Sequence, residues 1–140
     1  MEPYYHKVSY YETDRMGVTH HSNYIRWMEE ARVDYLNKIG VSYARLEEEG
    51  LVSPVVGLSC SYLRSTTFDD TVRIVVRLDS YRGVRFAFSY EMFLPDQPSP
   101  VFTASSTHCF LDQAGKPVMV RHHNPKLDAL FKAQLKEGRE

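Results

Sequence analysis

The segment from Tyr24 to Ile39 carries apolar residues at three- and four-residue steps, which is the spacing of one helix face. The main stripe is Tyr24, Trp27, Met28, Ala31, Tyr35 and Ile39, with Ile25, Val33 and Leu36 beside it. Ser22 or Asn23 can cap the start of this helix, and Gly40 can end it. We therefore expect a helix from about residue 23 to about residue 39, and its apolar face must be covered by another layer.

An acidic residue and a glycine stand just before this helix. The first N–H groups of a helix lack partners within it and together carry about half a positive charge. Here they would face the same ligand as the Asp14 side chain. Gly17 allows a tight turn or the close approach of a ligand. This arrangement suits a reaction that forms an anion. The alternative is that Asp14 merely caps the helix or complements its dipole.

After the helix the apolar period changes from helical spacing to two, which predicts strands. The expected strands are Tyr4 to Tyr11, Val56 to Tyr62, Val72 to Asp79, Val84 to Met92 and Val101 to Leu111. Arg82-Gly83 forms the turn of a hairpin, and Asp112 to Lys116 closes the last strand. Residues 42 to 49 and Pro125 to Lys136 predict two further helices.

Together these elements predict an α+β fold in which a largely antiparallel, five-stranded sheet wraps one long helix. The chain of 140 residues has the length of a single domain, and we expect one domain over residues 1–140. A five-stranded sheet leaves two edges that can pair with a second copy of the chain. We therefore expect a homodimer, or a homotetramer built from dimers.

The composition is that of an ordinary soluble globular protein, with 43% hydrophobic and 25% charged residues. A formal net charge of −1 argues against a broad nucleic-acid interface. The apolar runs are too short for a membrane span, and Met1 to Tyr10 lacks the apolar stretch of a signal peptide, so cytoplasm is the expected location. Cys60 and Cys109 are expected to be reduced core residues.

Two other kinds of catalytic site find little support. The histidines His20, His21, His108, His122 and His123 do not have the spacing of known metal-ligand motifs. A catalytic triad would need a Gly-x-Ser-x-Gly turn, which the sequence lacks. We therefore expect catalysis without metal or cofactor.

The run from Asp14 to Tyr24 resembles the motif of the hotdog-fold acyl-CoA thioesterases of the 4-hydroxybenzoyl-CoA thioesterase family. In that motif an aspartate is followed by a glycine, an apolar pair, aromatic or histidine residues, and an asparagine with a tyrosine. Tyr62-Leu63-Arg64 with Phe68-Asp69-Asp70 is similar to a second family block. The resemblance extends from Tyr4 to about Val120 and implies active sites shared between two protomers.

The resemblance also implies a role for each matching residue. Asp14 would be the catalytic carboxylate, acting as a nucleophile or as a general base for water. His21 would lie where a backbone N–H holds the thioester oxygen. The residues expected to bind substrate are Gly17, Asn23, Tyr24, Arg64, Arg82 and Arg85, of which Arg82 and Arg85 lie near the family's phosphate-binding cluster. Arg82 and Arg85 could instead be a solvated strand end.

Hydrolysis of an acyl-CoA or aroyl-CoA thioester to a free acid and coenzyme A is the predicted reaction. One rival is a non-catalytic protein that binds an acyl thioester, including one on an acyl carrier protein. A second rival is a hotdog hydratase acting on an enoyl thioester. The sequence leaves open the length of the acyl chain and the preference for an aromatic or an aliphatic acyl group. It also leaves open whether the carrier is coenzyme A or an acyl carrier protein.

Overall fold

A computed structural model describes residues 1–138 of the chain, with side chains described as far as Leu135. The chain divides into two compact units. The first unit comprises Met1–Tyr35, Cys60–Val76 and Tyr90–Ala104, and the second comprises Leu36–Ser59, Arg77–Ser89 and the residues from Ser105 onward. The single domain expected from the sequence stays a prediction.

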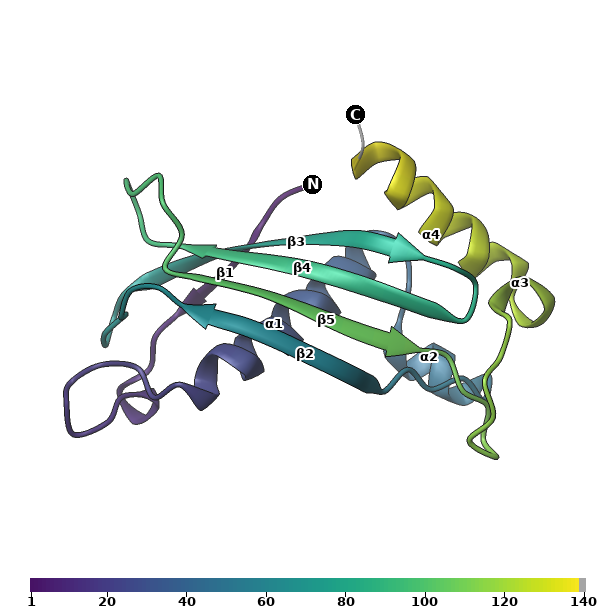
Figure 1. The fold of residues 1–140 in the computed structure, drawn as a ribbon, viewed down its shortest axis with the longest axis horizontal. Coiled ribbons are helices and arrows are strands. Elements are labelled where there is room, and N and C mark those ends of the chain that lie inside the picture. The colour runs from purple at the N-terminus through teal and green to yellow at the C-terminus, as the bar shows by residue number, and fades with distance from the viewer. Residues whose placement is uncertain (139–140) are drawn as a thin grey trace. The chain divides into compact units, whose positions relative to one another are not determined.

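The strands form one five-stranded sheet in the order β1-β3-β4-β5-β2 (Figure 1). Their bounds are β1 Tyr4–Lys7, β2 Val55–Tyr62, β3 Thr71–Tyr81, β4 Arg85–Phe93 and β5 Phe102–Cys109. β1 pairs antiparallel with β3, so that Tyr4 lies opposite Ile74. The predicted hairpin turn between β3 and β4 is confirmed, because the Arg82 N–H donates to the Arg85 carbonyl at 2.8 Å. β1 and β2 are the two edge strands.

The long helix α1, Ser22–Lys38, belongs to the first unit as far as Tyr35 and lies against one face of the sheet (Figure 1). The predicted helix and its apolar stripe are confirmed, since Trp27 and Met28 are fully buried. The Tyr24 ring stacks on Phe102 of β5 with a centroid separation of 5.0 Å. Ile25 is an exception to the predicted apolar face, because its side chain is exposed. The N-terminal half of α1 is thus anchored in the core and presents its start at a fixed place.

The second unit has an aromatic core of its own. Phe86 stacks on Phe110 with a centroid separation of 4.6 Å, and Phe131 packs edge-on against Phe86 at 5.3 Å. Phe131 belongs to α4, Pro125–Gly138, which confirms the predicted last helix. The predicted short helix is also confirmed as α2, Tyr43–Glu48. A further short helix, α3, Val120–His123, was not predicted.

The first strand is shorter than the sequence predicted. It ends at Lys7 instead of Tyr11, and a 3₁₀ helix, η1, Tyr10–Glu12, follows. The Ser9 N–H donates to the Glu12 carboxylate at 2.8 Å, and the Glu12 N–H donates to the Ser9 carbonyl at 2.9 Å. Serine followed three residues later by glutamate closes a helical turn on itself, and here this local pairing outweighs the strand-like alternation.

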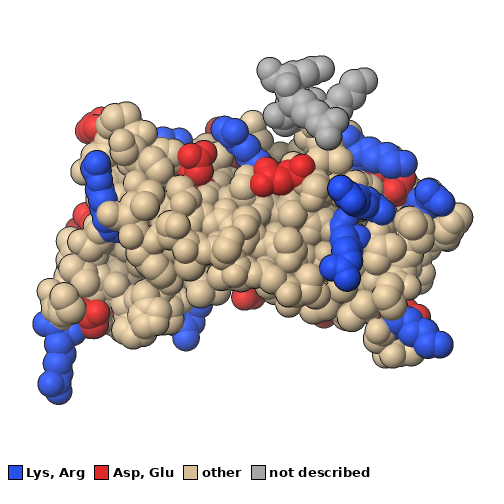
Figure 2. Space-filling view, in the orientation of Figure 1, with Lys and Arg blue, Asp and Glu red and all other residues tan. Residues whose placement is uncertain are grey.

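The surface agrees with the modest net charge. On the face shown in Figure 2, outside the grey atoms, most of the surface is uncharged, and several lysine and arginine side chains on the right of the view lie near acidic ones. None of the helices in residues 1–138 is both long enough and apolar enough to cross a bilayer. Cys60 and Cys109 are free thiols as predicted, but both are only half-buried and so are not the core residues that we expected.

Candidate active site

Asp14 stands at the base of a tight loop that precedes α1. The Asp14 N–H donates to the Val18 carbonyl at 2.9 Å, and the Gly17 N–H donates to the Asp14 carbonyl at 3.0 Å. Gly17 adopts a φ of 79°, which explains why this position carries a glycine. One carboxylate oxygen of Asp14, Oδ1, accepts the Met16 N–H at 2.8 Å. Asp14 therefore caps its own loop and does not cap α1.

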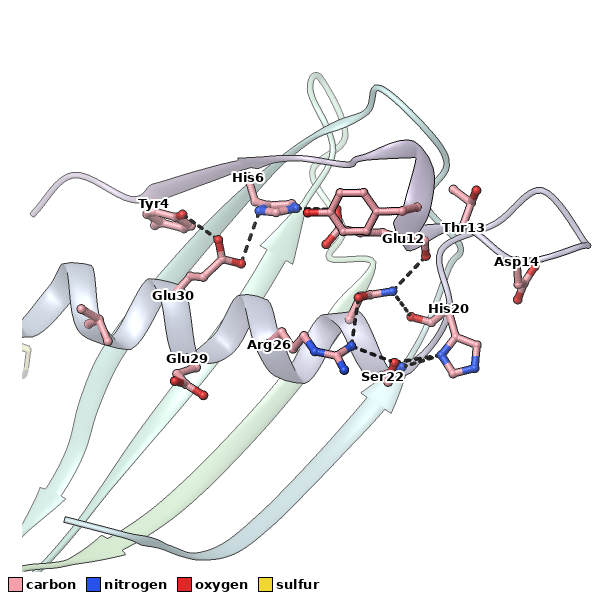
Figure 3. A pocket seen from close by; sticks show the side chains of 13 residues that line it. Tyr4, His6, Glu12, Thr13, Asp14, His20, Ser22, Arg26, Glu29 and Glu30 are labelled. Atoms are coloured by element: carbon pink, nitrogen blue, oxygen red, sulfur yellow. Dashed lines mark hydrogen bonds and ion pairs between the residues drawn. The ribbon is translucent and has the colours of Figure 1, made fainter. Parts of the chain in front are cut away.

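The other carboxylate oxygen of Asp14 is uncommitted, since within residues 1–138 no hydrogen bond involves Oδ2. Asp14 borders a cavity of about 1150 Å³ that runs along one flank of α1 (Figure 3). The ionisable side chains of its wall are Tyr4, His6, Tyr11, Glu12, Asp14, His20, Arg26, Glu29 and Glu30. A half-buried carboxylate with one free oxygen at the edge of a cavity can act on a bound electrophile or on water.

The start of α1 borders the same cavity through His20, Ser22 and Asn23. The His20 carbonyl accepts the Asn23 N–H at 3.0 Å, and the His20 ring nitrogen Nδ1 accepts the Ser22 N–H at 3.3 Å. The expectation that Ser22 or Asn23 caps the helix is wrong, because both lie inside its first turn and their side chains bind elsewhere. His20, two residues before the helix, caps it instead, because its carbonyl and ring nitrogen accept these two N–H groups.

His21 immediately precedes α1. Its carbonyl accepts the Tyr62 hydroxyl at 3.0 Å, and its exposed ring lies 4.3 Å from the His20 ring, centroid to centroid. Within residues 1–138 the His21 N–H donates to no acceptor. His20 lines the cavity, whereas His21 is not among the described residues of its wall.

The residues predicted to bind substrate lie in different surroundings. Asn23 is buried at the cavity wall, and its Nδ2 donates to the Glu12 carbonyl at 2.9 Å. Tyr24 is a core residue whose hydroxyl pairs with Thr66 Oγ1 at 2.9 Å. The carbonyl of Gly17 accepts the Thr67 hydroxyl at 2.7 Å.

The predicted arginines are not among the described residues of the cavity wall. Arg64 is exposed and donates to Gln97 Oε1 at 3.3 Å. Arg82 and Arg85 are exposed residues of the second unit, whereas the cavity is built entirely from the first unit. The substrate-binding roles of all six residues stay predictions. Within residues 1–138, no group of three or more His, Cys, Asp or Glu side chains is placed to hold a metal ion.

A network that the sequence did not predict is centred on a buried carboxylate of the cavity wall. Glu12 is 5% exposed, and its carboxylate accepts the Trp27 indole N–H at 2.7 Å. His6 Nε2 lies 2.8 Å from Glu12 Oε1, and His6 Nδ1 lies 3.4 Å from Glu30 Oε2 (Figure 3). The Tyr4 hydroxyl donates to Glu30 at 3.1 Å, which adds a second residue of β1 to the network.

The network sets the charge state of Glu12. Burial alone raises the pKa of this carboxyl, but the hydrogen bonds from Ser9, His6 and Trp27 stabilise the anion and bring its pKa below the ordinary value of 4.5. Glu12 is therefore a buried carboxylate at neutral pH. The only local sequence signal for it is the Ser9-x-x-Glu12 pattern, because the contacts of Glu12 with His6 and Trp27 depend on how β1 and α1 pack.

Comparison with known proteins identifies the family. The sequence profile of the thioesterase-like superfamily matches residues 8–135. A Bacillus subtilis (strain 168) protein, YneP, provisionally named an acyl-CoA thioesterase, is 30% identical over 85% of this chain and 86% of its own length. A provisionally named esterase of Aquifex aeolicus is 34% identical over 84% of this chain and 89% of its own.

A solved structure shows the same fold. The crystal structure of a DHNA-CoA thioesterase from Staphylococcus aureus superposes with a TM-score of 0.90 at 30% identity, covering 98% of this chain and 94% of that one. The chain belongs to the thioesterase-like superfamily. The predicted hotdog fold and the predicted reaction class, thioester hydrolysis, are thereby confirmed.

Proposed function

We propose that the protein hydrolyses an acyl-CoA or aroyl-CoA thioester to the free acid and coenzyme A, with Asp14 as the catalytic carboxylate. The observation that carries this proposal is that Asp14 and the start of α1 border one cavity. The names of the relatives support the substrate class, since one is called an acyl-CoA thioesterase and another a DHNA-CoA thioesterase.

In the proposed reaction Asp14 works through Oδ2, while Oδ1 stays bound to the Met16 N–H. As a nucleophile, Oδ2 would bond to the thioester carbon, the C–S bond would break, and water would then hydrolyse the resulting anhydride. As a general base, Oδ2 would take a proton from a water molecule whose oxygen attacks the same carbon. Both routes consume one water and release one acid and one thiol, and both stay open.

The His21 N–H is the proposed donor to the carbonyl oxygen as it becomes negative. This amide has no acceptor within residues 1–138 and stands at the positive end of α1. One such donor is typically worth about a hundred- to a thousand-fold in rate, and a positioned base adds about a hundred- to ten-thousand-fold. Because a thiolate is already a good leaving group, these two elements suffice without a general acid.

We further propose that the active unit is a homodimer that forms at β2. This strand is an edge of the sheet, so it presents backbone groups able to pair with another strand. Val56 and Leu58 are 50% and 41% exposed, which is high for apolar strand residues. Whether two dimers associate further stays open, and the cytoplasmic location stays a prediction.

A thiol-release assay over a panel of acyl-CoA and aroyl-CoA esters tests the proposed function. We expect release of free coenzyme A with at least one member of the panel. Saturable binding without thiol release would favour the non-catalytic thioester-binding protein. The same acyl groups attached to an acyl carrier protein test whether this carrier can replace coenzyme A. Hydration of an enoyl-CoA without thiol release would favour the hydratase.

A further inference from the structure

Both carboxylate oxygens of Glu12 accept hydrogen bonds, although the residue is buried. Its Oε1 accepts the Ser9 N–H at 2.8 Å and lies 2.8 Å from His6 Nε2, and its Oε2 accepts the Trp27 Nε1–H at 2.7 Å. These donors come from three elements of the first unit: the η1 turn, β1 and α1. The proposed chemistry uses none of them.

The backbone of Glu12 joins the two halves of the proposed site. Its carbonyl accepts the His20 N–H at 2.8 Å and the Asn23 Nδ2–H at 2.9 Å, which fixes the chain on both sides of His21. Two residues further on is Asp14, and the intervening Thr13 pairs with Thr19 in an antiparallel bridge. The loop that carries Asp14 and the start of α1 are thus attached to one residue.

We infer that Glu12 is a positioning residue for the proposed hydrolysis: its buried carboxylate holds the Asp14 loop at a set distance from the amides at the start of α1. The inference rests on the proposed function and adds to it a residue that touches no reacting atom.

The chemistry of Glu12 explains why a carboxylate is needed. Three donors converge on two oxygens, and only a carboxylate offers acceptors at both. A glutamine of the same size would turn an NH₂ group toward the Trp27 N–H or toward the Ser9 N–H. One buried donor would then lose its acceptor, and η1 would move to relieve the clash.

The test compares Glu12→Gln with Glu48→Gln. Glu48 lies on α2 and is not among the residues of the cavity wall, and within residues 1–138 its exposed carboxylate makes no hydrogen bond or ion pair. We expect Glu12→Gln to lower kcat by about 10- to 100-fold with KM changed less than about threefold, because a shift of about 1 Å in a catalytic group can cost a hundredfold. Glu48→Gln should change neither constant by more than about twofold, and thermal unfolding should show that both variants are folded.

A double variant separates positioning from general damage. If Glu12 acts by placing Asp14, then adding Glu12→Gln to Asp14→Asn should lower the residual kcat by less than about twofold, since no positioned carboxylate remains to be displaced. A merely structural role predicts that the two losses multiply, and that outcome would overturn the inference.

Two substitutions of His6 keep the inference testable if Glu12→Gln does not fold. His6→Phe retains the ring against Trp27, which His6 contacts at 4.6 Å between centroids, but removes the donor to Glu12. His6→Gln retains an N–H donor. We expect His6→Phe to lower kcat more than His6→Gln does, and equal kcat values in the two variants would contradict the inference.

The failures of the two proposals are distinguishable. A wild-type protein that releases no thiol from any ester overturns the proposed function and, with it, this inference. A wild type that turns over and depends on Asp14, together with a Glu12→Gln variant of unchanged kcat, overturns the inference alone.

Discussion

The Tyr81 hydroxyl donates a hydrogen bond of 2.5 Å to Asp128 Oδ1, which fastens the end of β3 to α4 within the second unit. Both residues are buried, and Lys132 of the same helix lies 3.0 Å from the other carboxylate oxygen. Burial raises the pKa of Tyr81, and the hydrogen bond to Asp128 with its negative charge raises this pKa further, so the phenol stays protonated as a donor. The Tyr81–Asp128 hydrogen bond therefore has a structural role, because it attaches α4 to β3.

Removing this donor should destabilise the protein without affecting catalysis. A hydrogen bond to a charged group contributes about 1.5–3 kcal/mol, so we expect Tyr81→Phe to lower the free energy of unfolding by that amount. Urea unfolding measures it. Tyr5→Phe is the matched control, because within residues 1–138 the Tyr5 hydroxyl makes no hydrogen bond and the side chain is 57% exposed. Equal stability of the two variants would contradict this account of Tyr81.

The same pair predicts how stability depends on pH. The hydrogen bond from Tyr81 lowers the pKa of Asp128 below its ordinary value of 3.8. A folded-state pKa below the unfolded one means that the unfolded chain binds more protons, so this contribution is fully present above about pH 4 and disappears as the pH falls through the folded value. The stability difference between wild type and Tyr81→Phe should therefore shrink in acid. A difference that stays constant from pH 7 to pH 3 would exclude this linkage.

The β2 edge predicts the oligomeric state. A lysine in place of Leu58 would put a charge among the exposed apolar residues of this strand, so Leu58→Lys should convert a dimer to a monomer. Tyr5→Lys on β1, the opposite edge of the sheet, is the control and should leave the dimer intact. Sedimentation velocity distinguishes the states. A wild type that is monomeric at micromolar concentration would refute the proposed interface.

Much of the fold was predictable because its signals are local. The spacing of Trp27, Met28 and Tyr35 determines a helix face wherever the helix packs, and the alternation in β3 and β4 determines a sheet face in the same way. The first strand was predicted too long because Ser9 and Glu12 close a local turn that alternation does not reveal. The family motif led to Asp14, and the structure places this residue beside a cavity.

The network around Glu12 could not be predicted from local patterns. His6 and Glu12 are six residues apart on different elements, and Trp27 lies fifteen residues beyond Glu12, so the three meet only because β1 and η1 pack beside α1. Helix capping was mispredicted for a related reason. Ser22 and Asn23 have the preferred chemistry for a cap, but α1 already begins at Ser22, and the carbonyl and ring nitrogen of His20 accept the N–H groups of Asn23 and Ser22.

The central claim is that the Asp14 carboxylate performs thioester hydrolysis, and the most direct test is steady-state thiol release by Asp14→Asn. An asparagine side-chain oxygen can still accept the Met16 N–H, which the native Oδ1 accepts at 2.8 Å, so the loop should keep its shape. The account predicts a folded variant with kcat reduced by at least about a hundredfold, the low end for loss of a positioned base. A folded Asp14→Asn variant that releases thiol at the wild-type rate would contradict it.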